Sequence, residues 1–61
     1  MFRRYKFKGM DGSCGYRTGK VYWGQVEVMF DGYTRFVPLN PFRMIVPYSD
    51  QAAFYTNWSK V

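Results

Sequence analysis

The chain has 61 residues, of which 48% are hydrophobic and 23% aromatic, and nine Lys and Arg against four Asp and Glu give a formal charge of +5. This length makes one domain, residues 1–61, and such a domain buries only about 60% of the surface that its unfolded chain exposes. One cysteine and no histidine exclude an internal disulfide and a structural zinc site. Stability must therefore come from a dense core or from self-association, and we expect no cofactor.

The charge and the aromatic content both bear on the class of partner. A basic balance favours nucleic acid, a nucleotide or an acidic protein face, although a charge of +5 also serves solubility alone. Six Phe, six Tyr and two Trp exceed what so small an interior can enclose. Some tyrosines must therefore lie at the surface, either half-buried with solvated hydroxyls or at an interface. No apolar run approaches the roughly 20 residues of a membrane span, and one unpaired cysteine fits a reducing compartment. We expect a cytoplasmic protein without a membrane partner.

The first predicted strand is Phe2–Lys8, because its residues alternate in the way of a half-buried strand. Tyr5 and Phe7 would face the core, which leaves a row of cations in solvent at Arg4, Lys6 and Lys8. Two interpretations of this basic row stay open. It protects a sheet edge from aggregation, which we favour, or it binds an anion.

A loop follows from Gly9 to Gly19, since this stretch holds four of the six glycines. It is not a phosphate-binding loop, because Gly15–Lys20 is one residue short and Val21 stands where Ser or Thr is needed. We expect Met10 and Cys14 to turn back to the core, with Cys14 as a small buried apolar side chain rather than a nucleophile.

The clearest signal is a hairpin with Asp31-Gly32 at its tip, between strands at 21–30 and 33–37. Val26, Val28 and Phe30 define its apolar face. Gly24 indicates a bulge or a sharp bend, which is how a long strand closes a small barrel.

After Pro38, a second turn at 39–41 is followed by a short predicted strand, Phe42–Val46, that ends at Pro47. Only Arg43 guards this strand. We therefore expect it to form the seam of a two-fold homodimer, with Tyr48 and Tyr55 alongside.

A helix is predicted at 50–60, with Ser49 as its N-cap and Asp50 in its first turn. Phe54, Trp58 and Val61 fall on one face, through which so short a helix must dock. Together, these elements predict a mainly β fold: an SH3-like small antiparallel barrel of about four to five strands, with a short C-terminal α-helix over one open end.

Several of these residues also form a pattern. Lys8 to Tyr22 reads K-G-x-D-G-S-x-G-x-x-x-G-x-x-Y, and P-Y-S and A-F-x-x-N-W follow near the C-terminus. This pattern resembles a group of very small proteins from phages and prophages of Gram-positive bacteria, over most of the chain. Cys14 stands where a larger apolar residue is usual, and Asp50 where a second Ser is usual. The resemblance implies a phage-encoded accessory protein that acts in the host cytoplasm, without an assigned activity.

The sequence does not favour an enzyme, because it shows no acid–base pair and no nucleophile with its base. By analogy with phage proteins of this size, we expect a non-catalytic binding protein in counter-defence or host takeover. It would occupy a host protein or sequester a small anionic ligand. The candidate contact residues are Tyr16, Arg17, Lys20, Tyr22, Trp23, Arg35 and Arg43. The alternative is a nucleic-acid-binding small barrel that uses the basic row of Arg4, Lys6 and Lys8.

Overall fold

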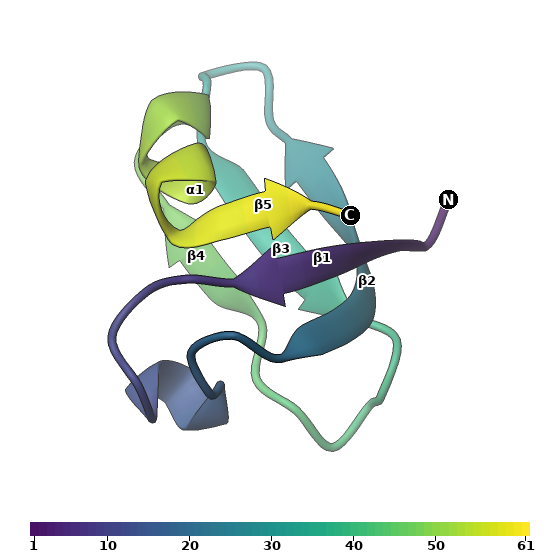
Figure 1. The fold of residues 1–61 in the computed structure, drawn as a ribbon. Coiled ribbons are helices and arrows are strands. Elements are labelled where there is room, and N and C mark those ends of the chain that lie inside the picture. Colours follow the sequence, from purple (N-terminus) through teal and green to yellow (C-terminus); the bar gives the residue numbers. More distant parts are fainter.

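A computed structural model describes all 61 residues as one five-stranded antiparallel sheet, in the order β4-β3-β2-β1-β5, with one short helix. The elements are β1 (Arg3–Phe7), a 3₁₀ turn η1 (Ser13–Gly15), β2 (Val21–Val28), β3 (Thr34–Pro38), β4 (Val46–Tyr48), α1 (Gln51–Asn57) and β5 (Trp58–Lys60). In Figure 1, β1 and β5 cross in front of β3 and β4, so the sheet folds over itself, and α1 lies by the edge strands β4 and β5. The predicted mainly β small barrel with a C-terminal helix is confirmed. None of its helices has the length and apolar character that crossing a membrane requires.

The sheet folds over at Gly24, where β2 changes partner. Up to Gly24, β2 pairs with β1, and from Gly24 onward it pairs with β3. Both registers advance one residue at a time, so the structure has the predicted bend and not a bulge. A Cβ at Gly24 would overlap the Phe36 ring and lie 2.7 Å from the carbonyl oxygen of Val37. Only glycine therefore lets the two halves of the barrel approach this closely.

The predicted hairpin is present, with a loop one residue longer than Asp31-Gly32. Met29 N–H donates to the Tyr33 carbonyl at 2.7 Å, and Gly32 N–H donates to the Met29 carbonyl at 2.9 Å. Gly32 has a φ of 90°, as a three-residue loop of this kind requires. Because the turn begins at Met29, β2 ends at Val28, and the prediction that Val28 and Phe30 face the core is wrong: both are exposed.

The core is built almost wholly from aromatic rings. Trp58 lies at its centre, stacked on Phe36 at 4.0 Å between ring centroids, with Phe7 at 5.0 Å and Tyr16 at 5.2 Å. Its members are Tyr5, Phe7, Tyr16, Tyr22, Phe36, Val46, Phe54 and Trp58. Tyr5, Phe7, Phe54 and Trp58 are core residues as predicted.

Two predictions for the loop before β2 are wrong. Met10 is 81% exposed, and Cys14 is exposed at the tip of the loop with a φ of 52°. The loop is anchored to the core by Tyr16 instead, which is fully buried and donates its hydroxyl hydrogen to the Met44 carbonyl at 2.8 Å.

The predicted strand at Phe42–Val46 is also wrong. Phe42–Ile45 forms an exposed loop, and strand β4 begins at Val46 and includes Pro47. The preceding turn extends further than expected, because Asn40 Oδ1 accepts from Phe42 N–H at 2.9 Å and the Asn40 carbonyl accepts from Arg43 N–H at 3.1 Å. Pro47 is tolerated because β4 is an edge strand. The expected dimer seam does not exist as a strand.

The C-terminal helix is shorter than predicted. Asp50, not Ser49, is its N-cap, and Asp50 Oδ1 accepts from Ala53 N–H at 2.8 Å. The helix ends at Asn57, since Trp58 is extended and starts β5, which pairs with β1. Val61 therefore lies beyond the helix and is exposed.

Candidate anion-binding site

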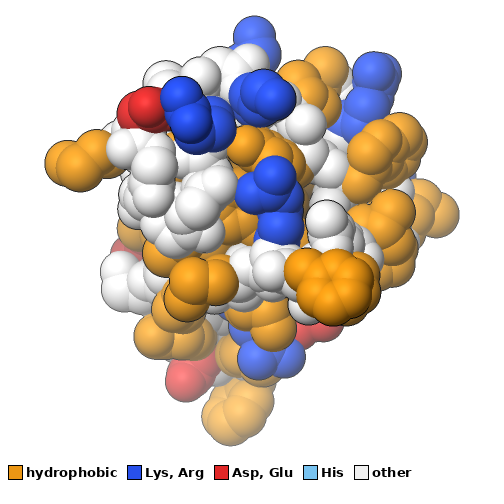
Figure 2. Space-filling view, turned by 90° about the horizontal axis from the view of Figure 1, so that it is seen from below, with side chains coloured by type: hydrophobic (Ala, Val, Ile, Leu, Met, Phe, Trp, Pro, Cys, Tyr) orange, Lys and Arg blue, Asp and Glu red, His pale blue; other side chains and the backbone are white.

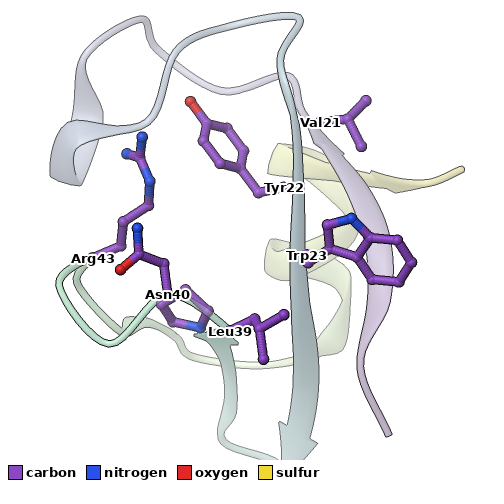
Figure 3. Close-up of a pocket in the computed structure, with 7 residues that line it drawn as sticks. Val21, Tyr22, Trp23, Leu39, Asn40 and Arg43 are labelled. Carbon is purple, nitrogen blue, oxygen red and sulfur yellow. The ribbon is translucent and has the colours of Figure 1, made fainter.

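One pocket, of about 410 Å³, opens between the start of β2 and the loop that follows β3. Its walls are Val21, Tyr22, Trp23, Pro38, Leu39, Asn40 and Arg43. Figure 3 shows that Tyr22, Asn40 and Arg43 point into the space between β2 and this loop, whereas Val21 and Trp23 lie on the other side of β2. The pocket therefore extends from the loop, which forms its inner wall, to the outer face of the sheet.

Arg43 supplies the positive charge of the pocket, and its neighbours fix its position. The guanidinium lies over the Tyr22 ring at 4.8 Å from the centroid and over the Tyr16 ring at 5.6 Å. Its Nη1 donates to the Gly15 carbonyl at 3.0 Å. Neither of the two ion pairs in the molecule involves Arg43, since they join Arg17 to Asp11 and Arg35 to Glu27. Arg43 is thus a positioned cation that lacks an acidic partner.

The two tyrosines beneath the guanidinium have structural roles. Burial raises the pKa of Tyr16 to about 12, a rise that the nearby Arg43 charge only partly opposes. The Tyr22 hydroxyl accepts from Arg17 N–H at 3.0 Å, which holds the glycine-rich loop against the pocket. Both rings present their faces to the Arg43 cation.

The outer face of the sheet continues from the pocket onto β1. Arg4 pairs directly with Trp23 and Lys6 with Val21, so these four side chains share one side of the sheet. The Arg4 guanidinium lies 6.0 Å from the centroid of the Trp23 ring, and Trp23 is 54% exposed. Figure 2 views the molecule from below Figure 1 and shows most of the visible Lys and Arg side chains along one side, with others near the centre and toward the opposite side.

The sheet order removes the interpretation of the basic row that we favoured. Strand β1 lies between β2 and β5, so it is not an edge strand. Arg4, Lys6 and Lys8 therefore have no sheet edge to protect, and edge protection was the wrong explanation. All three side chains are exposed, and none of them takes part in an ion pair.

The structure brings together three of the predicted contact residues, Tyr22, Trp23 and Arg43. Tyr16 is fully buried below Arg43 and has no surface to offer a ligand. Lys20 is exposed just before β2.

The other two predicted arginines are bound to acids. Arg17 pairs with Asp11 at 3.3 Å. Arg35 lies outside the pocket and pairs with Glu27 at 2.7 Å. The two residues therefore differ from Arg43 in having their charge partly neutralised.

The sequence did not predict that Val21, Pro38, Leu39 and Asn40 belong to the site. The turn at Leu39-Asn40-Pro41 was visible in the sequence, but its contact with β2 depends on the fold. Searches for similar proteins add no assignment, since no protein-family model, no curated protein and no solved structure matches this chain.

Proposed function

We propose that this protein is a non-catalytic binding protein that holds an anionic ligand at the pocket between β2 and the loop 39–45. The observation that carries this proposal is Arg43. Its guanidinium is fixed over the Tyr22 ring at 4.8 Å, faces an otherwise mostly apolar pocket and has no acidic partner. A cation held in place before binding loses little freedom when an anion arrives, and this favours binding.

The positions of the four acids support a role without catalysis. Asp50 caps α1, and Asp31 accepts from Tyr33 N–H in the hairpin turn at 3.0 Å. Asp11 and Glu27 are held in ion pairs. Each carboxylate is thus used by a turn, a cap or a pair, and none lines the pocket where a general base would be needed.

The dimensions of the pocket favour a small ligand over a protein face. Its volume of about 410 Å³ lies within the range of about 300 to 1,000 Å³ that is common for small-molecule sites. Together with the resemblance to small phage proteins, this supports sequestration of a small anionic ligand in the host cytoplasm, during counter-defence or host takeover. In a variant of this proposal, the protein uses the same surface to occupy a host protein.

The test is a titration with small anions followed by the fluorescence of the exposed Trp23. The probes are inorganic phosphate, diphosphate and the four ribonucleoside monophosphates. We expect Arg43→Gln to weaken binding of the preferred probe at least about tenfold, because a charged hydrogen bond contributes roughly 1.5–3 kcal/mol. Arg35→Gln is the matched control, since it removes the same charge outside the pocket.

Circular dichroism would show that both variants keep the fold. Equal affinity of Arg43→Gln and the wild type, or no response to any probe, would contradict the proposed function.

A further inference from the structure

We propose that the anionic partner is a single-stranded nucleic acid, which runs along the outward face of β1 and places a base against Trp23 at the rim of the pocket. This inference rests on the proposed function: the pocket takes one nucleotide as its small anionic ligand, and the rest of the strand lies on the surface beside it. It adds the basic row of Arg4, Lys6 and Lys8 to the binding surface.

The first argument is charge complementarity along a line. Alternate residues of a strand recur about every 6.8 Å, which is about two phosphate steps at roughly 3.4 Å per nucleotide of a stacked strand. Arg4 and Lys6 lie on one face of β1, and Lys8 follows directly after it. No ion pair neutralises them, and their strand is internal to the sheet. A linear polyanion fits a linear row of free cations better than a compact anion does.

The second argument is the aromatic group at the end of this row. Trp23 is 54% exposed although it is one of the largest apolar side chains, and it stands directly opposite Arg4 across the β1–β2 ladder. An exposed indole beside a cation provides the two contacts that single-stranded nucleic acid offers, a base face and a phosphate. Arg43 and Asn40 line the same pocket from the opposite side of β2, so the next nucleotide would pass over the start of β2 to reach them.

The geometry selects single strands over duplexes. In a duplex each base is held by pairing as well as by stacking, so turning one out against the indole is costly, whereas a single strand can unstack one base for this contact. A protein that reads duplex DNA usually inserts a helix or a β-ribbon into the major groove. The only α-helix here has seven residues and docks against β3, β4 and β5. The row from Arg4 to Lys8 spans about 13 Å, enough for about four stacked nucleotides.

The experiment is fluorescence anisotropy with three probes at low salt: a 12-nucleotide single strand, the duplex of the same sequence and a mononucleotide. We expect the single strand to bind most tightly and to quench the tryptophan fluorescence. Three phosphate contacts would give a slope of log affinity against log salt of about −2. Lys6→Gln should reduce that slope by about 0.7. Trp23→Ala should weaken single-strand binding at least about tenfold.

Lys60→Gln is the matched control for charge. Lys60 is exposed on β5, but it is opposite Tyr5, out of phase with the row. We expect the affinity of the Lys60→Gln variant for the single strand to stay within about twofold of the wild type. Its slope of log affinity against log salt should stay unchanged. Thermal melting checks that each variant is folded.

Several results would overturn the inference. These are no single-strand binding at low salt, equal affinity for the duplex, an effect of Lys60→Gln as large as that of Lys6→Gln, and capture of an acidic host protein without nucleic-acid binding. If the single strand fails while the mononucleotide still binds and depends on Arg43, the inference is wrong and the proposed function stands. If neither probe binds, both fail.

Discussion

Tyr16 shows how one residue can join the parts of so small a core. Its ring contacts those of Phe7, Tyr22 and Trp58, and its hydroxyl group donates to the Met44 carbonyl. The glycine-rich loop, the sheet and the loop before β4 therefore meet at one side chain. Burial raises the pKa of this hydroxyl group to about 12, because the ionised form would stand in a poorly solvated place, and the nearby Arg43 charge only partly opposes this rise.

This pKa predicts a loss of stability in alkali. An unfolded tyrosine ionises near pH 10, so the folded state holds the proton more tightly, and its contribution is complete below pH 10. The free energy of unfolding should fall as the pH rises from 10 to about 12. Urea unfolding at pH 9 and pH 11 measures the fall. Tyr16→Phe is the control, because it removes the titrating group, and it should show a smaller difference between the two pH values. An equal difference in both proteins would contradict this account.

The residues of the core were predictable only where apolar residues recur at a regular spacing along the chain. The alternation in β1 identified Tyr5 and Phe7, and the spacing of four residues identified Phe54 and Trp58. Tyr16 lies in an aperiodic loop, and its burial depends on contacts with β1, β2 and β5 that no local pattern records. For the same reason the sequence suggested Tyr16 as a ligand contact, although it is fully buried. Arg43 was suggested for its charge and lines the pocket.

At the scale of elements, a single hydrogen bond links the two edges of the folded sheet. Trp58 Nε1 at the start of β5 donates to the Tyr48 hydroxyl oxygen at the end of β4, at 2.8 Å. The strands β4 and β5 are the two ends of the strand order and make no ladder with one another. The side of the barrel next to α1 is therefore held by side chains, chiefly Tyr48, Phe54 and Trp58.

We predict that Tyr48→Phe lowers the free energy of unfolding by about 1–3 kcal/mol, since it leaves the Trp58 N–H unpaired in a fully buried ring. The measurement is the urea midpoint at pH 7 with an unchanged slope. Tyr55→Phe is the matched control, because Tyr55 is 47% exposed, and it should cost less than about 0.5 kcal/mol. Similar midpoints for the two variants would show that the bond between the edges does not stabilise the barrel.

The elements that local chemistry specifies were predictable, and those that depend on distant pairing were not. Asp31-Gly32 sets the hairpin, and Gly24 marks the bend. In contrast, nothing in Ser59-Lys60 indicates that a strand, Trp58–Lys60, ends the chain's secondary structure. Strand β5 forms because the backbone hydrogen-bonding groups on one side of β1 are free to pair with it. This pairing ends the helix at Asn57. The apolar run Phe42–Val46 resembled a strand. However, the turn at Asn40 and Pro41 extends into this run as far as Arg43.

At the scale of the whole molecule, the predicted homodimer remains a prediction, and its interface would use the predicted stretch as a loop instead of a strand. Both edge strands are short, at three residues each, and carry Pro47 or Lys60, which discourages pairing between molecules. The candidate surface is instead the loop of Phe42, Met44 and Ile45, whose side chains are 94%, 61% and 48% exposed. A stable interface buries about 800 Å² on each partner, more than three side chains supply. We therefore expect a weak, concentration-dependent two-fold dimer.

Sedimentation equilibrium at protein concentrations from about 1 to 100 µM tests this prediction. Dimers with a small buried interface area dissociate in this range. The average mass should rise from the 7.3 kDa of the monomer towards twice that value. Phe42→Ser should keep the monomer mass at every concentration. Phe30→Ser is the control, because Phe30 is fully exposed in the hairpin loop, away from this surface, and it should associate as the wild type does. A wild-type mass of 7.3 kDa throughout would exclude the dimer and leave Phe42, Met44 and Ile45 free for a foreign partner.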